Sequence, residues 1–134
     1  MILIALDTST SIGFDEAKPH LIRQVNEILN GAQGIVIFFN TKIDGSVRTN
    51  CLKEIDFDMR GSSSIWDSLF HIIDDHRHLS HVNFFVITDG KDTSSYKKTC
   101  SDIEHDLWYL QLVHRWNVKW VDWKPLKRTC LLFV

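Results

Sequence analysis

The sequence predicts an α/β protein built on one open, doubly wound and mostly parallel sheet. Short, nearly continuous apolar runs at residues 2–6, 35–39 and 82–88 have the composition of parallel strands that are covered on both faces. Segments with apolar residues at helical spacing alternate with these runs. The resulting order, β-α-β-β-α-β-α-β, is that of a Rossmann-like sheet. A length of 134 residues fits a single domain over residues 1–134.

A helix is predicted between the first two strands. Apolar residues recur at helical spacing from Leu21 to Leu29. Pro19 suits the first helical position, and Gly31 suits the stop. We therefore expect this segment to cross from one parallel strand to the next.

The strand after residues 35–39 is predicted to run antiparallel to its neighbour. Asp44 and Gly45 lie between two strand-like segments. An Asp-Gly pair in that position is a strong signal for a two-residue hairpin turn. The sheet should thus hold one antiparallel strand among parallel ones.

Two further helices are predicted in the second half of the chain. The first begins near Ser63 or Ser64, and Asp67 stands three residues after Ser64 as in a capping box. The next opens with Ser101 and Glu104 at the same spacing. Both carry apolar residues at helical spacing, so both should pack against the sheet.

Composition and charge exclude several classes of function. The formal net charge is -2, and the Lys and Arg residues are scattered, so no nucleic-acid partner is expected. No stretch approaches the roughly 20 apolar residues that span a bilayer, so no membrane contact is expected. The opening apolar run is short for a signal peptide and has no cationic segment before it. We therefore expect a cytoplasmic, intracellular location.

The cysteine and histidine patterns predict neither a disulfide framework nor a zinc site. Cys51, Cys100 and Cys130 are odd in number and widely spaced, so they are expected to be small buried hydrophobic residues. Four histidines lie within residues 71–81 at spacings of five, two and three residues. Across a helix end these spacings do not present a tetrahedral set. A solvated helix terminus is the favoured interpretation.

Three polar motifs follow apolar runs or precede a helix. The first contains Asp7, Ser9 and Ser11, whose alternation lets an extended loop turn all three side chains to one side. The second is a Gly-Ser-Ser-Ser segment containing Ser63, and the third places Asp89 after an apolar run. In a doubly wound sheet the carboxyl ends of the strands form the ligand-binding edge. We expect oxygen ligands for a hard divalent cation to meet there.

Together these motifs make the chain resemble a von Willebrand factor type A (vWA) domain. In that family an Asp-x-Ser-x-Ser loop, a threonine in a second loop and an aspartate in a third form the metal-ion-dependent adhesion site (MIDAS). Asp7, Ser9 and Ser11 match the first loop, and Asp89 matches the third. Ser63 stands at the threonine position and keeps the hydroxyl. The predicted antiparallel strand agrees with the topology of the family.

The resemblance implies adhesion, and no enzymatic activity. Hydroxyls and waters would hold Mg²⁺ or Mn²⁺ and leave one position for an Asp or Glu carboxylate of a protein partner. Ser9, Ser11 and Ser63 would be direct ligands or lie close to the ion. Asp7 and Asp89 would hold coordinated waters and orient the serines.

Three other interpretations stay open. In the first, Asp7, Ser9 and Ser11 cap a turn without binding metal. Asp92 would likewise be a solvated turn residue. A Mg²⁺-dependent phosphotransferase or phosphatase would use Asp7 as nucleophile, but such enzymes need a second acid where Ser9 stands. A metal-free vWA scaffold would bind partners through its C-terminal edge.

The C-terminal end departs from the family, whose resemblance covers about residues 1–123. A last strand is predicted over residues 117–123, and only five residues separate it from the apolar run 129–134. A parallel crossover needs about a dozen residues, so the fold is expected to be C-terminally shortened. Residues 124–134 are expected to form an atypical C-terminal strand that folds back antiparallel at the edge of the sheet, or else to pack where the family normally has a helix. We also expect homo-oligomers to form through this region.

Overall fold

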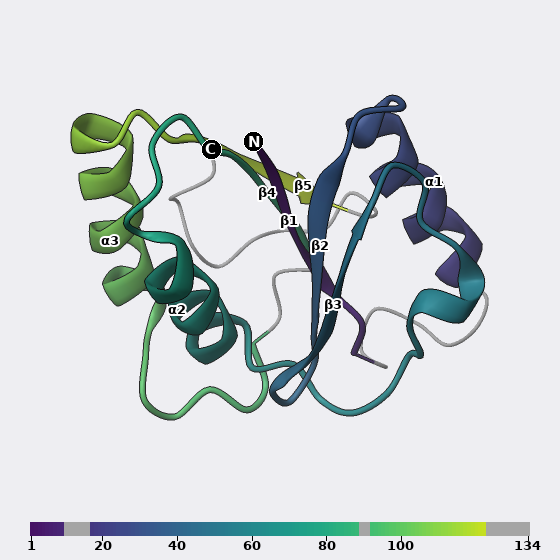
Figure 1. The fold of residues 1–134 in the computed structure, drawn as a ribbon. Coiled ribbons are helices and arrows are strands. Elements are labelled where there is room, and N and C mark those ends of the chain that lie inside the picture. The colour runs from purple at the N-terminus through teal and green to yellow at the C-terminus, as the bar shows by residue number, and fades with distance from the viewer. Residues whose placement is uncertain (10–16, 89–91, 123–134) are drawn as a thin grey trace.

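The computed structural model describes residues 1–9, 17–88 and 92–122 of the chain. In chain order its elements are β1 (Ile2–Asp7), α1 (Lys18–Leu29), β2 (Gly34–Phe39), β3 (Ile43–Thr49), the 3-10 turn η1 (Glu54–Asp56), α2 (Ile65–His76), β4 (Asn83–Thr88), α3 (Cys100–Val113) and β5 (Asn117–Asp122). One helix, α1, lies on one face of the sheet, and α2 and α3 lie on the other (Figure 1). The predicted order of strands and helices is therefore confirmed.

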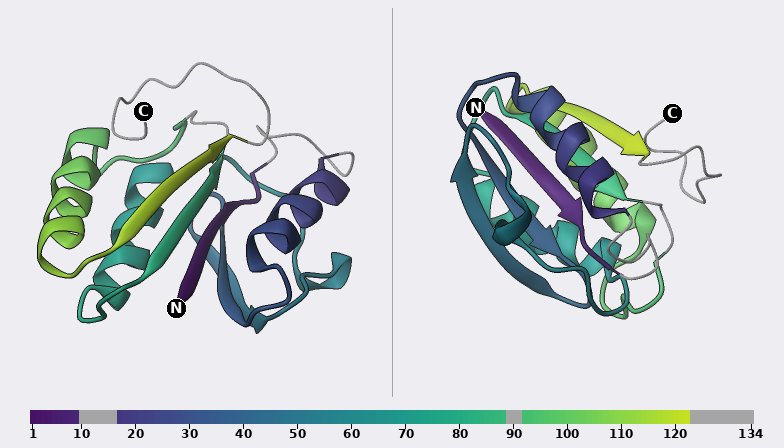
Figure 2. Two further views of the ribbon diagram at one scale, coloured as in Figure 1. Left: turned by 90° about the horizontal axis from the view of Figure 1, so that it is seen from above. Right: turned by 90° about the vertical axis from the view of Figure 1, so that its right-hand side faces the viewer.

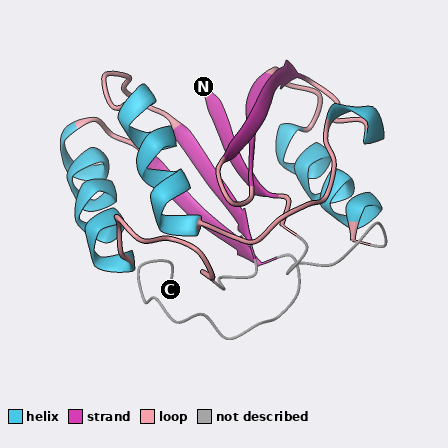
Figure 3. Ribbon diagram, turned by 90° about the horizontal axis from the view of Figure 1, so that it is seen from below, coloured by secondary structure: helices cyan, strands magenta, loops and turns pink. Residues whose placement is uncertain are grey.

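The sheet is mostly parallel, with β1 at its centre. The strand order is β3-β2-β1-β4-β5. β1 is parallel to both β2 and β4, and β4 is parallel to β5, whereas β3 is antiparallel to β2. Figure 2 shows the strands side by side with a marked twist. The carboxyl ends of the parallel strands thus meet at one edge of the sheet, as the sequence predicts (Figure 3).

Each face of the sheet carries its own hydrophobic core. Side chains alternate between the faces along a strand. In β1, Ile4 and Leu6 therefore pack with the buried face of α1, while Leu3 and Ala5 pack with α2 and α3. All of these side chains are fully buried. This arrangement explains why β1 is apolar at consecutive positions.

The connection between β2 and β3 differs from the predicted hairpin. Asp44 and Gly45 lie inside β3, and Gly45 pairs with Phe38 next to a shift in register. The chain turns at residues 40–42 instead, where the Asn40 amide donates to the Lys42 carbonyl over 2.9 Å. Gly45 has φ +142, so it serves an irregular point of the strand pair rather than the turn. The prediction of an antiparallel strand is confirmed, but its turn was wrongly placed.

The start of α3 also differs from the prediction. Thr99, not Ser101, is the N-cap, and its side chain accepts a hydrogen bond from the Asp102 amide. Asp102 reciprocates by accepting from the Thr99 amide over 2.8 Å. The capping box is therefore present two residues before its predicted position, because Thr99 and Asp102 have the same spacing as Ser101 and Glu104.

The cysteines do not behave as the sequence suggested. Cys51 is exposed and free, whereas Cys100 is half-buried and disulfide-bonded. Cys130 lies outside the described residues. The expectation of buried cysteines without a disulfide is thus wrong for Cys51 and for Cys100.

Two further expectations concern membranes and the C-terminal end. Within residues 1–9, 17–88 and 92–122, every helix is too short or too polar to cross a lipid bilayer. Residues 124–134, expected to form an atypical strand and a self-association surface, lie outside the described residues. That expectation stays a prediction.

Replacing a core leucine should destabilise the protein far more than replacing an exposed one. Leu69 of α2 is 0% exposed and belongs to the core that α2 and α3 share with the sheet. Leu69→Ala should lower the free energy of unfolding by about 2–5 kcal/mol, because the lost methyl groups leave a cavity. Leu112→Ala is the matched control, since Leu112 is 59% exposed on α3, and should change it by less than about 0.5 kcal/mol. Urea unfolding measures both; equal losses would contradict this placement of α2.

Candidate metal site

The carboxylate of Asp7 is the centre of the candidate site. Asp7 is the last residue of β1, and its side chain is 0% exposed. Its Oδ2 accepts hydrogen bonds from Thr88 Oγ1 over 2.6 Å and from Ser63 Oγ over 3.0 Å. Its Oδ1 accepts from the Ser9 amide over 2.9 Å. Groups from three distant parts of the chain therefore converge on one buried carboxylate.

The topology of the sheet explains why these residues meet. In the parallel pair of β1 and β4, Leu6 lies opposite Ile87, so Asp7 and Thr88 end neighbouring strands at the same edge. Ser63 comes two residues before the start of α2 at Ile65, and α2 begins at this edge of the sheet (Figure 3). The C-terminal end of β1 and the N-terminal end of α2 thus lie at the same edge of the sheet. This brings the second motif to Asp7 of the first.

Hydrogen bonds also join the second loop to the segment that follows β4. The Ser63 amide donates to Thr93 Oγ1 over 2.9 Å, and the Ser63 carbonyl accepts from the amides of Thr93 and Ser94. Asp92 Oδ1 accepts from the Ile65 amide over 2.8 Å, which caps the start of α2. The interpretation of Asp92 as a solvated turn residue is therefore wrong. These bonds fix the position of Ser63 relative to β4.

Asp67 also joins α2 to the segment that follows β4. It does not form the predicted capping box with Ser64. Its carboxylate accepts from the backbone amides of Tyr96, Lys97 and Lys98, at distances from 2.7 to 3.4 Å. Ser64 is the N-cap of α2 but makes no capping hydrogen bond with its side chain. The Ser64 hydroxyl lies 2.6 Å from Ser94 Oγ instead. Both side chains thus hold the β4–α3 connection against α2.

A second polar network lies on the other side of Asp7. Thr8 Oγ1 donates to the Phe39 carbonyl, and Asn40 Nδ2 donates to Asp44 Oδ2 over 3.1 Å. Arg60 forms a bidentate ion pair with Asp44, through Nε at 2.9 Å and Nη2 at 3.1 Å. This pair raises the pKa of Arg60, first by hydrogen bonding and then by charge. The Arg60 amide also donates to the Thr8 carbonyl over 2.9 Å, which ties residue 60 to the residue after Asp7.

Burial makes the Asp7 carboxyl group a weaker acid than an ordinary aspartate. Burial raises the pKa of Asp7 from 3.8 to about 6, while the hydrogen bonds from Thr88, Ser9 and Ser63 lower it by less. Near neutral pH the carboxylate therefore carries a charge that its hydrogen bonds only partly compensate. A nearby cation would supply the missing compensation.

The donor atoms around Asp7 suit a hard divalent cation. The side chains of Asp7, Ser9, Ser63 and Thr88 offer carboxylate and hydroxyl oxygens and no nitrogen or sulfur. Hydroxyls that donate their proton to Asp7 keep oxygen lone pairs for another ligand. In the part of the chain that the structure describes, no three His, Cys, Asp or Glu side chains gather as a metal-holding group. The chemistry of the donor set, with one central carboxylate, fits a Mg²⁺ or Mn²⁺ site.

The structure brings together three of the five residues predicted from the sequence. Asp7, Ser9 and Ser63 are fully buried and share one hydrogen-bond network. Ser11 and Asp89 lie outside the described residues, so their assignment stays a prediction. The observed network is compatible with the MIDAS assignment of the three described residues.

Sequence reasoning missed two hydroxyls of the network. Thr88 makes the shortest of the hydrogen bonds given above to Asp7, and Thr93 exchanges hydrogen bonds with the backbone of Ser63. A signal for Thr88 was present, because it precedes Asp89 and ends the apolar run at residues 82–88. No comparable local pattern points to Thr93, whose partner lies 30 residues away.

The histidines in the second half of α2 and just after it do not form an alternative metal centre among the described residues. His76 Nδ1 lies 2.6 Å from the Ile72 carbonyl, within the last turn of α2. His71, His78 and His81 are exposed. A solvated helix terminus, as expected, describes this region.

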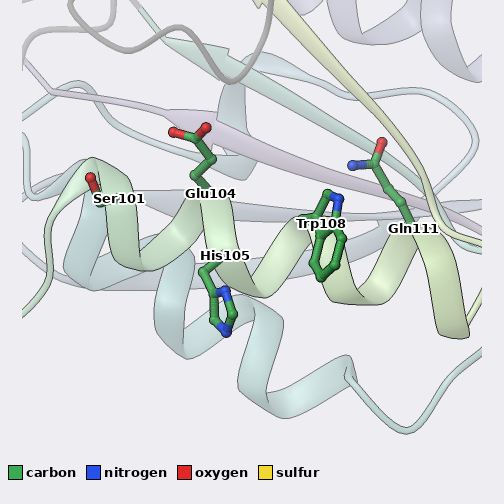
Figure 4. A pocket seen from close by; sticks show the side chains of 5 residues that line it. All are labelled: Ser101, Glu104, His105, Trp108 and Gln111. Atoms are coloured by element: carbon green, nitrogen blue, oxygen red, sulfur yellow. The ribbon is translucent and has the colours of Figure 1, made fainter.

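A hollow of about 550 Å³ lies along the surface of α3. Its lining residues are Ser101, Glu104, His105, Trp108 and Gln111. Glu104, Trp108 and Gln111 project from one side of the helix and His105 from the other (Figure 4). The described residues that line this hollow all belong to α3.

Comparisons with solved structures identify the fold. No protein-family model and no curated protein match the chain. It is similar to the ArnB paralog VWA2 from Sulfolobus acidocaldarius, with a TM-score of 0.60 at 14% identity, over 90% of this chain and 33% of that chain. It is also similar to proximal thread matrix protein 1 (PTMP1) from the mussel byssus, with a TM-score of 0.56 at 18% identity, over 90% and 34% of the two chains.

These similarities define a vWA-like fold, as the resemblance in the motifs implied. The fold is α/β, with a mostly parallel five-stranded sheet and one antiparallel strand. The chain spans about a third of the length of each of these two structures. At such low identity the match concerns the fold alone.

The raised pKa of Asp7 predicts how stability depends on pH without metal. The folded protein binds the Asp7 proton more tightly than the unfolded chain does, with a pKa of about 6 against 3.8. The stabilising contribution is therefore complete below about pH 4 and is lost as the pH rises through 6. The loss should be about 3 kcal/mol in the free energy of unfolding.

Urea unfolding in chelator between pH 4 and 7 measures this effect against Asp7→Asn. The asparagine cannot titrate, so the difference between the two proteins removes the contribution of the histidines. We expect wild type to lose stability relative to Asp7→Asn across this range. Parallel curves for the two proteins would contradict the buried, weakly acidic state of Asp7.

Proposed function

We propose that this protein is a binding module that uses Mg²⁺ or Mn²⁺ at Asp7, Ser9 and Ser63 to take up an acidic side chain of a protein partner. The observation that carries the proposal is that the first loop, the segment before α2 and the end of β4 converge on the buried Asp7 carboxylate. Ser11 and Asp89 complete the proposed ligand set from the sequence. The vWA-like fold supports a role in protein interaction.

Two of the described residues would contact the ion directly, and two would orient those ligands. Ser9 and Ser63 are candidates for direct contact, because their hydroxyls are uncharged and lie beside Asp7. Asp7 and Thr88 orient the hydroxyls and set the local charge, as groups around a metal usually do. The ion, when bound, would provide an electrophilic position for an incoming carboxylate.

A ligand set dominated by hydroxyls favours binding of an anion. Several carboxylates around the ion would neutralise it, whereas neutral serine oxygens leave it attractive to a partner's Asp or Glu. Asp7 is the single carboxylate in the described part of the network. The proposed partner is therefore a protein that presents an acidic residue.

The proposed role involves binding without turnover. A phosphotransferase built on Asp7 would need a second acid two residues later, and Ser9 stands there. The hydroxyls of Ser63 and Thr88 both donate to Asp7 Oδ2, and the Ser9 amide donates to Oδ1. These contacts suit a structural carboxylate better than a nucleophile.

Calorimetric titration with Mg²⁺ and with Mn²⁺ tests the proposal. Asp7→Ala should weaken binding by at least about tenfold, because the hydroxyls lose the group that orients them. Asp75→Ala is the matched control: Asp75 is an exposed acid near the other end of α2, beside the histidines. Circular dichroism should show that both variants remain folded.

Equal effects of the two substitutions would assign the metal to the surface near the histidines instead. No binding of either ion by the folded wild-type protein would exclude the proposed site. The vWA-like fold would then act as a metal-free scaffold.

A further inference from the structure

One side chain, that of Thr93, holds both backbone groups of Ser63. The Ser63 amide donates to Thr93 Oγ1 over 2.9 Å, and Thr93 Oγ1 in turn donates to the Ser63 carbonyl over 3.3 Å. The amides of Thr93 and Ser94 donate to the same carbonyl over 2.8 and 3.0 Å. A residue has only two soft backbone dihedrals, and these contacts restrain both. The direction in which the Ser63 side chain leaves the backbone is therefore set by the segment after β4.

A second threonine holds the preceding residue of the same loop. Thr41 Oγ1 accepts from the Ser62 amide over 3.2 Å and donates to the Ser62 carbonyl over 3.4 Å. Gly61 has φ +74, and a Cβ at this position would lie 2.9 Å from Thr41 Oγ1, so glycine permits this approach. Threonines from the β2–β3 turn and from the segment after β4 thus hold consecutive residues. The Thr93 contacts are the shorter of the two pairs.

The Ser63 hydroxyl depends on this backbone support. Side chains that branch at Cβ are stiff at χ1, and serine lacks the second branch. The side chain of Ser63 is 0% exposed, and its Oγ donates to Asp7 Oδ2 over 3.0 Å. That bond selects the rotamer, whereas Thr93 fixes the backbone from which the rotamer is built. Together they determine where the lone pairs of the Ser63 oxygen lie relative to Asp7.

Divalent cations differ in how precisely their ligands must be placed. Mg²⁺ demands near-ideal octahedral geometry with oxygens at about 2.0–2.1 Å, whereas Ca²⁺ accepts about six to eight oxygens at about 2.3–2.6 Å in flexible geometry. A displaced Ser63 hydroxyl would therefore weaken binding of Mg²⁺ more than binding of Ca²⁺.

We propose that Thr93 is a positioning residue of the candidate metal site, which fixes Ser63 and thereby makes the site prefer Mg²⁺ to Ca²⁺. This inference rests on the proposed metal-dependent function and adds a determinant of its ion selectivity. Thr93 acts through the backbone of Ser63 and does not itself contact the ion. Thr41, with its longer hydrogen bonds to Ser62, has a smaller part in the same support.

Thr93→Val tests the inference, because valine keeps the branched shape of threonine and removes the hydroxyl. Calorimetric titration should show Mg²⁺ binding at least about tenfold weaker than in wild type. Ca²⁺ binding should weaken by less than about threefold, because Ca²⁺ tolerates displaced ligands. Thr93→Ser keeps the hydroxyl and should bind Mg²⁺ within about threefold of wild type. Thr93 is exposed, so both variants should fold, as circular dichroism would show.

Thr49→Val is the matched control. Thr49 Oγ1 accepts from the Cys51 amide over 3.0 Å and donates to the Cys51 carbonyl over 2.9 Å, the same pair of contacts that Thr93 makes. Thr49 pairs with Gly34 at the start of β2, so it lies at the edge of the sheet opposite Asp7. This substitution should leave the affinities for both ions unchanged.

Amide hydrogen exchange gives a second readout in the metal-free protein. In Thr93→Val the Ser63 amide loses its acceptor, so it should exchange at least about fivefold faster than in wild type. The Ile65 amide donates to Asp92 Oδ1 instead, and its exchange rate should stay the same. The comparison separates a local effect at Ser63 from a general loosening of the fold.

Separate results would overturn the inference and the proposed function. Unchanged Mg²⁺ affinity in Thr93→Val, or equal losses for Mg²⁺ and Ca²⁺, would overturn the positioning role and leave the metal-dependent function intact. Rapid exchange of the Ser63 amide in wild type would overturn that role without the use of a variant. Failure of the folded wild-type protein to bind either ion would overturn both proposals.

Discussion

The arrangement of the whole edge depends on keeping one carboxylate buried. Removing a charged carboxylate from water is costly, and hydrogen bonds recover only part of the cost. Asp7 obtains these bonds from the Ser9 amide, Ser63 and Thr88. Each of these donors belongs to a different loop or strand end, so satisfying Asp7 brings the first loop, the start of α2 and the end of β4 together. The raised pKa of Asp7 is the remaining imbalance, which a bound cation would remove.

Much of the fold follows from local patterns in the sequence. The central strands are recognisable because β1, β2 and β4 are buried on both faces and are therefore apolar at consecutive positions. The antiparallel strand also follows, although its turn does not. Asn40 and Lys42 close that turn through a backbone hydrogen bond, and Gly45 is used for a bulge instead. An Asp-Gly pair serves either purpose, and only the register of β2 and β3 decides which.

The residues of the candidate site can be predicted where a local motif indicates a metal site. They cannot be predicted where the hydrogen-bond partner is distant in the sequence. Asp7 and Ser9 could be named because their residue types and spacing fit one kind of site, and Ser63 because the resemblance to vWA domains places it at the threonine position of the second loop. Asp67 and Asp92 could not, since each carboxylate accepts amides about 30 residues away. Asp67 was expected to cap its own helix, but amides brought near by the chain after β4 compete for the same oxygens. A short stretch of sequence does not show which amides, local or distant, a carboxylate accepts from. The role of Asp67 could therefore not be predicted.

The place of Asp7 at the end of the central strand has a mechanical consequence. β1 is hydrogen-bonded along its length to β2 on one side and to β4 on the other. A partner that pulls on this edge along the strand direction loads both ladders in shear, so many backbone bonds must break together before β1 slides. A pull on an edge strand would instead open its bonds one at a time. Tension applied at Asp7 along β1 would thus be shared by the hydrogen bonds of both ladders.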